Sequence, residues 1–402
     1  MKKQIYTDFL IIGAGIIGLS IAYKLKQQFP DSKILIIEKE KEIGFHASGR
    51  NSGVLHAGFY YTSDSIKAKL CKAGNEAWRN YCEENKLRIN RCGKLVVARN
   101  EVELEGIHVL HKRGVANNVI LDVISDEEAT EIEPKAKTYE KALWSPTTAT
   151  VDPIEVILSI KDKLLSLGVE ILLDVKFIHK TDKAIQTNIG EISAGYLVNA
   201  AGLYADKIAK EFGFSENYQI LPFKGLYLYA SDKGLKLKTN IYPVPNLNNP
   251  FLGVHFTVTA FNKTKIGPTA IPAFWRENYK GFDRFNLNEL IDILSVESGL
   301  FLANKFNFRR LAYEEMAKFY KNNLVNLAGS LLYEVDDSTN YSWGKPGIRA
   351  QLINSKTRTL EMDFKFEGDD KSFHVLNAVS PAFTCALPFS DLIVEEIAKK
   401  IN

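Results

Sequence analysis

Three glycines near the start of the chain have the spacing of a phosphate-binding turn. Gly13, Gly15 and Gly18 follow an apolar run over residues 8–12, and residues 19–25 then take up helical spacing. In such a strand, turn and helix, the first glycine allows a tight turn, the second lets the backbone approach a pyrophosphate, and the third lets the helix pack closely on the strand. The N-terminus of the helix, at Ile16 and Ile17, is then directed at the phosphates.

An acid follows at the distance that a dinucleotide site requires. The apolar run over residues 34–37 ends at Glu38, twenty residues after Gly18. A carboxylate here accepts a hydrogen bond from a ribose hydroxyl and repels a 2′-phosphate, so the expected ligand is FAD or NAD and not NADP. The alternative is an ordinary βαβ unit without a ligand, but the strand, turn, helix, second strand and acid all agree with a dinucleotide site.

Small, polar and aromatic residues alternate over residues 44–61 without a helical or strand period, which predicts a loop followed by a short helix. Ser48, Asn51 and Ser52 can donate hydrogen bonds to phosphate or flavin oxygens, and the glycines let the backbone lie against a planar ring. We therefore expect this loop to contact the cofactor. The alternative is a polar surface turn.

The rest of the chain predicts two kinds of sheet. Strands over residues 169–173 and 192–201 alternate with helices and should join the parallel sheet of the first unit, so the cofactor domain is discontinuous. Residues 217–321 contain short aromatic-rich strands, which predict a mixed or antiparallel sheet for the substrate. The predicted cofactor domain is 1–75, 140–215 and 335–402, and the predicted substrate domain is 76–139 and 216–334. Further helices are predicted over 65–84, 101–117, 152–167, 203–212 and 387–400, and a further strand over 93–98.

Bulk properties narrow the class of protein. The chain has 402 residues, of which 46% are hydrophobic and 25% are charged. Its net charge of +3 does not indicate the excess of positive charge that binds nucleic acid. Four cysteines without paired spacing predict free, mostly buried thiols in a reducing compartment, the cytoplasm, and no metal site. No apolar run reaches about 18 residues, which excludes a transmembrane helix on sequence grounds and leaves peripheral contact with a membrane open.

The block from His46 to Tyr61 resembles the D-amino-acid-oxidase-like FAD superfamily, and within it the L-2-hydroxyglutarate oxidase/dehydrogenase family. Further segments that resemble this family are collinear with it and cover essentially the whole chain: 67–71, 92–95, 201–206, 222–225, 240–245, 251–257 and 347–351. The resemblance implies FAD as the cofactor and oxidation of L-2-hydroxyglutarate to 2-oxoglutarate, with electrons passed to oxygen, a quinone or another acceptor. It also implies an α/β fold, in which a Rossmann-like FAD-binding domain of the glutathione-reductase type carries a discontinuous α+β substrate domain.

The resemblance also implies which residues hold FAD. Gly13, Gly15, Gly18 and Glu38 would bind the ADP half, with Lys39 beside them. The pyrophosphate and flavin would be lined by Ser48, Asn51, Ser52, Gly53 and Val54. The remaining contacts would come from Val175 at the adenine, Ala201 and Gly202 under the ribityl chain, Gly347, and Pro381 and Ala382 at the pyrimidine end.

Oxidation of a 2-hydroxy acid requires a base for the hydroxyl proton and a flavin N5 that receives the C2 hydride. His56, in the flavin loop, and His255, in the expected substrate sheet, are the two candidates, and their order is open. A dicarboxylate also requires cations, and Arg349, in a glycine-bounded turn, is the first candidate. The pocket would be completed by Tyr60, Tyr61, Lys224, Tyr242 and Arg276, while Arg50 could bind either a carboxylate or the pyrophosphate.

The sequence departs from the family pattern at Arg50, where many members have histidine, and at Phe383 and Cys385, where small residues are usual. Three alternatives stay open. The first is a sibling enzyme that acts on an amino acid or glycerol 3-phosphate, and the second is a flavin-binding module without turnover. The third is a nicotinamide dehydrogenase. Residues 240–245 and 347–351 favour the hydroxyglutarate branch over its siblings. The oligomeric state is not predicted.

Overall fold

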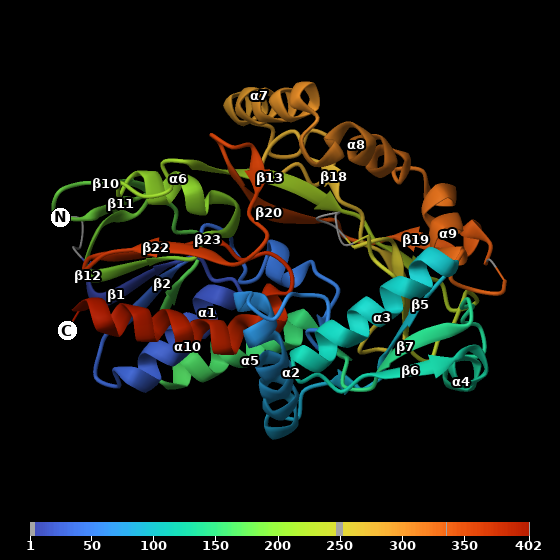
Figure 1. Ribbon diagram of the computed structural model, residues 1–402. Coiled ribbons are helices and arrows are strands. Elements are labelled where there is room, and N and C mark those ends of the chain that lie inside the picture. Colours follow the sequence, from blue (N-terminus) through green and yellow to red (C-terminus); the bar gives the residue numbers. More distant parts are fainter. Residues whose placement is uncertain (1–4, 247–251, 335, 402) are drawn as a thin grey trace. The chain divides into compact units, whose positions relative to one another are not determined.

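The computed structural model describes residues 5–246, 252–334 and 336–401, and the chain divides into two compact units. The first unit comprises Met1–Asn51, Pro153–Leu221 and Ala350–Asn402, and the second comprises Ser52–Asp152 and Pro222–Arg349 (Figure 1). Both are therefore discontinuous in sequence. Residues 247–251, which include the start of the family-like segment 251–257, lie outside the described residues.

The first unit is built on a buried, mainly parallel sheet. Strand β1 (Ile5–Ile12) pairs in parallel with β2 (Ile34–Ile37) and with β12 (Gly190–Asn199), and β2 pairs in parallel with β9 (Glu170–Leu172). This confirms the prediction that the later strands join the first βαβ unit. The sheet is extended by β10 (Phe177–Lys180), β11 (Ile185–Thr187), β22 (Lys365–Gly368) and β23 (Ser372–Asn377).

Helices cover this sheet. The helix α1 (Ile16–Gln28) contacts both α5 (Pro153–Ser166) and α10 (Ala382–Ile401), and Figure 1 shows the three side by side. Because α1 lies between the sheet and these helices, eight of its residues are buried, including Gly18. A shorter helix, α6 (Ala205–Lys210), follows β12 and contacts β23. The helix α10 begins five residues before the predicted start at 387.

The second unit is built on a mixed sheet of eight strands, as the sequence predicts. Only the pair β5–β15 is parallel, and the other neighbouring strands whose register is known run antiparallel. In spatial order the strands are β19 (Tyr341–Trp343), β14 (Leu228–Ala230), β17 (Thr264–Gly267), β16 (His255–Val258), β15 (Asn240–Pro243), β5 (Lys94–Val97), β7 (Lys141–Ser145) and β6 (Asp122–Ser125).

The two faces of this mixed sheet differ because side chains alternate along each strand. Leu95, Ile241, Phe256 and Ile266 lie in one apolar cluster with residues of α4 (Asp126–Ile132) and α9 (Lys321–Gly329). Their neighbours in the strands, which point to the opposite face, include the polar side chains Lys94, Tyr242, His255, Thr257 and Lys265. We call this second surface the polar face. Beside Tyr242 it continues into an apolar cluster that α3 (Glu101–Ala116) covers.

Smaller elements complete the second unit and show why its limits differ from the predicted domain boundaries. Strand β3 (Val54–Leu55) pairs with β8 (Ala149–Val151), which also pairs with β4 (Ile89–Asn90), so residues near 54 and 150 belong with the second unit. Pairing of β19 with β14 likewise places the residues near 342 in the second unit. The other elements of the chain are α2 (Ile66–Glu84), β13 (Tyr218–Gly225), β18 (Ile271–Pro272), α7 (Leu287–Ala303), α8 (Phe308–Ala317), β20 (Gly347–Asn354) and β21 (Thr359–Leu360).

Two further predictions can be compared with the structure. The short helix expected within residues 44–61 is a single 3₁₀ turn at Ala47–Gly49, because the chain then enters β3. All four cysteines are free, and three of them are buried. A search of the described residues finds no helix long and apolar enough to span a membrane.

Candidate active site

The glycine turn of the first unit leaves no room for a side chain at Gly13 or Gly18. Gly13 has a φ of +107°, and a Cβ there would lie 2.6 Å from the Ala200 carbonyl oxygen. A Cβ on Gly18 would lie 2.0 Å from the carbonyl oxygen of Gly13. The helix α1 begins after Gly15 without a capping side chain from that residue, and its first turn contains no acid. The first turn of the helix therefore places no carboxylate of its own at the positive N-terminal end, which suits a pyrophosphate site.

Glu38 is buried at the end of β2 and braces this turn. Its Oε2 accepts the backbone N–H of Ala14 at 2.8 Å, and its Oε1 accepts that of Glu40 at 3.0 Å. Each carboxylate oxygen has two acceptor sites, so the pair keeps capacity for a ribose hydroxyl. The carbonyl of Glu38 accepts the N–H of Val175 at 2.8 Å, which brings the predicted adenine contact next to the acid.

The loop after β2 supports the turn through its polar side chains. Ser48 Oγ accepts the N–H of Ile16, the first residue of α1, at 2.9 Å, and Asn51 Nδ2 donates to the Ser48 carbonyl at 2.6 Å. Arg50 Nε donates to the Phe45 carbonyl at 2.6 Å, and the guanidinium lies over the Phe45 ring. Arg50 is thus held by its own loop.

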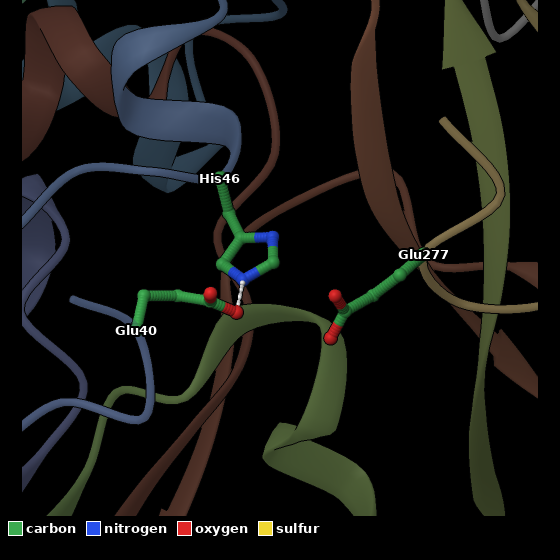
Figure 2. A group of neighbouring side chains, drawn as sticks. All are labelled: Glu40, His46 and Glu277. Atoms are coloured by element: carbon green, nitrogen blue, oxygen red, sulfur yellow. Dashed lines mark hydrogen bonds and ion pairs between the residues drawn. The ribbon is translucent and has the colours of Figure 1, made fainter. Parts of the chain in front are cut away.

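A second pair of side chains in this loop is shown in Figure 2. His46 Nε2 lies 2.9 Å from Glu40 Oε1, and Glu40 also binds the ammonium of Lys39. The Lys39 ammonium lies 5.3 Å from the centroid of the Tyr204 ring.

The other residues predicted to hold FAD fall in both units. The first unit contains Ala201, Gly202, Pro381 and Ala382. Ala201 follows the C-terminal end of β12, and Ala382 is the first residue of α10. Ser52, Gly53, Val54 and Gly347 belong to the second unit.

The two candidate bases lie in the second unit with a lysine beside them. His56 follows β3 and is 7% exposed, and its Nδ1 lies 3.5 Å from the Nζ of Lys94, which is 0% exposed. The Lys94 ammonium also faces aromatic rings, with its Nζ 4.4 Å from the Tyr242 ring centroid and 5.1 Å from that of Tyr60. The sequence leaves open which of His56 and His255 is the base. Lys94 lowers the pKa of both histidines, and His255 further lowers that of His56.

His255 has a fixed ring. Its Nδ1 lies 2.8 Å from the Gly253 carbonyl oxygen, which only accepts, so Nδ1 carries the proton and Nε2 the lone pair. The imidazole stacks on Tyr242 with a centroid distance of 3.6 Å and an interplanar angle of 17°. The neighbours Tyr242 and His255 are brought together because Ile241 pairs with Phe256 in the adjacent register position.

Burial dominates the electrostatics of this surface. It lowers the pKa of His56 well below the usual value, with a further lowering by Lys94 and His255. It lowers the pKa of His255 to about 3. The positive charges of Lys94, Lys265 and Arg349 also oppose protonation of His255. Burial lowers the pKa of Lys94 to about 7. Both histidines are therefore neutral near neutral pH.

Several more cations are buried in the second unit. Burial lowers the pKa of Lys265 to about 7 and that of Lys224 to about 8. Lys265 lies on the polar face with its Nζ 4.6 Å from the Tyr227 ring centroid, and Lys224 donates to Asn278 Oδ1 at 3.0 Å. Burial also lowers the pKa of Arg349, in β20, while Tyr227, Glu315 and Tyr61 favour its charged form.

The remaining predicted substrate residues lie at different depths of the second unit. Tyr60 is buried, and within the described part of the chain its hydroxyl has no hydrogen-bond partner. Tyr61 is half-buried, with the Lys67 ammonium over its ring. Arg276 is buried in the segment between β18 and α7, where its backbone N–H donates to Glu289 Oε2 at 3.0 Å.

Sequence reasoning missed Lys94, Lys265 and Tyr227. A signal was present for Lys94, because a lysine next to Leu95, Val96 and Val97 begins a strand that is buried at all four positions. The alternation of side chains along a strand would also have placed Lys94 on the same face as Val96 and on the opposite face from Leu95. For Lys265 and Tyr227 we find no comparable local signal, because both follow from strand pairing across the sheet.

Comparisons with known proteins agree with this geometry. Residues 8–355 match the family described as FAD dependent oxidoreductase. L-2-hydroxyglutarate dehydrogenase of Escherichia coli is 34% identical over 396 residues, covering 97% of this chain and 93% of the relative. The human mitochondrial L-2-hydroxyglutarate dehydrogenase is 34% identical over 418 residues, covering 98% and 89%.

Solved structures show the same fold at lower identity. L-α-glycerophosphate oxidase of Mycoplasma pneumoniae, solved with FAD bound, has a TM-score of 0.76 at 21% identity and covers 98% of this chain and 95% of its own. Glycine oxidase of Geobacillus kaustophilus has a TM-score of 0.73 at 18% identity, covering 99% and 96%. The predicted α/β FAD-binding fold is confirmed.

Proposed function

This chain belongs to the FAD-dependent oxidoreductase family, among the L-2-hydroxyglutarate dehydrogenases, and from that premise we propose that it oxidises L-2-hydroxyglutarate to 2-oxoglutarate. Its cofactor is FAD. The observation that carries the substrate is the set of buried cations and neutral histidines in the second unit, because a 2-hydroxy dicarboxylate needs both. The proposed acceptor of the electrons is oxygen, a quinone or another oxidant.

The residues of the first unit fit FAD by their own geometry. The turn excludes a Cβ at Gly13 and Gly18, the start of α1 has no acid, and Glu38 keeps capacity for a ribose hydroxyl. We assign the ADP half to Gly13, Gly15, Gly18 and Glu38. Ser48 and Asn51 hold the loop at the start of α1. The N-terminus of α10, at Pro381 and Ala382, is assigned to the pyrimidine end, where a helix dipole stabilises negative charge.

FAD supplies the acceptor for the hydride that leaves C2 of the substrate. The protein must remove the hydroxyl proton, and we assign this role to His56. Neighbouring positive charge opposes proton uptake by either histidine, from Lys94, Lys265 and Arg349 at His255 and from Lys94 at His56. His56 differs because its Nδ1 faces the Lys94 Nζ at 3.5 Å, whereas the Nδ1 of His255 faces the Gly253 carbonyl. His255 instead presents an Nε2 lone pair, which can accept a hydrogen bond from the substrate and orient it.

The carboxylates of the substrate are assigned to the buried cations. Arg349 can bind one carboxylate through two parallel hydrogen bonds. Burial lowers the pKa values of Lys265 and Lys224, and Asp152 offsets part of this effect at Lys265. A bound anion would further favour their charged forms. Arg276 remains the candidate for the distal carboxylate, and Tyr61 remains a residue that completes the pocket. The buried Tyr60 hydroxyl is a donor for a substrate oxygen.

Anaerobic bleaching of the flavin absorbance tests this function. Addition of L-2-hydroxyglutarate to the purified protein should bleach the band, whereas D-2-hydroxyglutarate, L-lactate, glycerol 3-phosphate and an amino acid should not. Bleaching by glycerol 3-phosphate or an amino acid instead would assign the chain to a sibling activity. A flavin that none of them reduces would support a binding module without turnover.

Substitution of Glu38 tests the cofactor site. Glu38→Gln keeps one acceptor oxygen but loses the charge and one of the two bonds that brace residues 14 and 40, so we expect FAD to dissociate about tenfold more readily. Equilibrium dialysis of FAD from the purified variant measures this. Glu42→Gln, an exposed acid of the same loop, is the matched control. Equal retention of FAD in both variants would remove Glu38 from the site.

A further inference from the structure

Lys94 has no part in the function proposed above, although it is fully buried next to the proposed base. Only the Cys71 and Cys92 thiols favour its charged form, and it makes no ion pair with any carboxylate among residues 5–246, 252–334 and 336–401. A buried ammonium without an acid is costly. Its pKa of about 7 means that the neutral amine is accessible under ordinary conditions.

The position of Lys94 is set by rigid elements. Gly93 has a φ of +67°, and a Cβ there would lie 2.1 Å from the Trp144 ring, so the strand entry allows only glycine. Asn240 Nδ2 donates to the Gly93 carbonyl at 2.7 Å and its Oδ1 accepts the N–H of Val258 at 2.9 Å. These contacts tie β5, β15 and β16 together around the lysine.

The groups that face Lys94 come from every element packed around it. They are His56 after β3, Phe59 and Tyr60 in the next segment, Cys71 of α2, Cys92 before β5, Tyr242 of β15 and His255 of β16. Of these, the His56 Nδ1 is the ring nitrogen within hydrogen-bond reach of the Lys94 Nζ, at 3.5 Å. His255 uses its own Nδ1 on the Gly253 carbonyl.

We propose that Lys94 is a positioning residue that sets the tautomer of His56 and takes up its Nδ1 proton during the reaction. The inference rests on the proposed role of His56 as the base. A neutral amine accepts the Nδ1–H and leaves the Nε2 lone pair to accept a proton. An ammonium donates to Nδ1, and the ring proton then occupies Nε2, which can accept no other.

The proton balance follows directly. The substrate O–H bond breaks and its proton binds His56 Nε2, while the Nδ1 proton passes to the Lys94 Nζ. The C2–H bond breaks and its hydrogen leaves with both electrons of the bond. The flavin is the oxidant that accepts them, and the carbon–oxygen double bond forms. After the product leaves, Nε2 releases its proton to water, and the ammonium of Lys94 returns its proton to Nδ1.

The ¹⁵N NMR spectrum of histidine-labelled protein tests the tautomer without substrate, with His56 assigned through the His56→Gln variant. In the wild type we expect the proton on Nδ1 above the Lys94 transition near neutral pH and on Nε2 below it. In Lys94→Met we expect one tautomer throughout. A wild-type ring that keeps one tautomer, or a switch that survives in Lys94→Met, would overturn the inference.

Kinetics supply the second readout. The pKa of His56 lies well below its usual value, so this histidine alone would give no pH dependence of the rate near pH 7. Protonation of Lys94 should instead slow flavin reduction as the pH falls through about 7, which gives the pH–rate profile a descending acid limb. Lys94→Met should lose this limb and about tenfold in rate, and Lys94→Arg, a permanent donor to Nδ1, should lose about 100-fold. A limb that persists in Lys94→Met would contradict the relay.

The two proposals fail in different ways. If L-2-hydroxyglutarate does not bleach the flavin, the substrate is wrong, but the tautomer of His56 still decides the role of Lys94. If bleaching occurs and the tautomer does not respond to Lys94, only the relay is wrong.

Discussion

Replacement of His56 by glutamine is expected to lower the rate of flavin reduction by L-2-hydroxyglutarate about a thousandfold, with FAD still bound. General base catalysis by a positioned side chain contributes roughly 100-fold to 10,000-fold, and glutamine keeps a similar polar shape without a basic nitrogen. Stopped-flow reduction under anaerobic conditions measures this rate. The flavin spectrum before mixing verifies that the cofactor site is intact.

The matched control is His255→Gln. Both histidines are buried in the second unit and burial lowers the pKa of each, but the Nδ1 of His255 is committed to the Gly253 carbonyl and that of His56 faces the Lys94 Nζ. We expect this variant to lose about tenfold, mainly through a higher KM, because it removes a hydrogen-bond acceptor and the stack on Tyr242. A larger loss in His255→Gln than in His56→Gln would reverse the two assignments.

Replacement of Arg349 by alanine is expected to lower kcat/KM for L-2-hydroxyglutarate about a thousandfold, which corresponds to about 4 kcal/mol. Arg349 is partly buried near Tyr227, Glu315 and Tyr61, and its loss removes a two-pronged contact with a substrate carboxylate. Most of the effect should appear in KM, because the contact forms on substrate binding. Steady-state kinetics with an artificial electron acceptor separate KM from kcat.

Two further variants refine the assignment of Arg349. Arg349→Lys keeps the charge but not the planar pair of donors, so it should recover only part of the loss. Lys356→Ala, which removes an exposed cation beyond the end of β20, should leave the kinetics unchanged. If Arg349→Ala also behaved like the wild type, Arg349 would not bind substrate, and the carboxylates would have to be held by the buried lysines.

The cofactor half of this protein could be predicted from local sequence. The turn at Gly13, Gly15 and Gly18 and the acid at Glu38 lie within one βαβ unit, where spacing alone determines which atoms meet. The structure agrees in detail, since a Cβ on Gly13 or Gly18 would collide with backbone and since Glu38 reaches the turn. Even the later strands were correctly assigned to this sheet, because their buried apolar runs match those of the first unit.

The polar face of the second unit required the tertiary structure. Lys94 lies beside Tyr242 because β5 pairs in parallel with β15, and it lies beside His56 through a contact with the segment after β3. No local spacing specifies which distant segments meet. Alternation along each strand determined which residues share a face, but not which strands supply it. The sequence by itself therefore determined the dinucleotide turn and the kinds of side chain available for catalysis. Only the long-range pairing of β5, β15, β16 and β17 decided that His255, a buried lysine and their aromatic neighbours share one face, since such pairing depends on burial across the whole sheet and not on nearby residues.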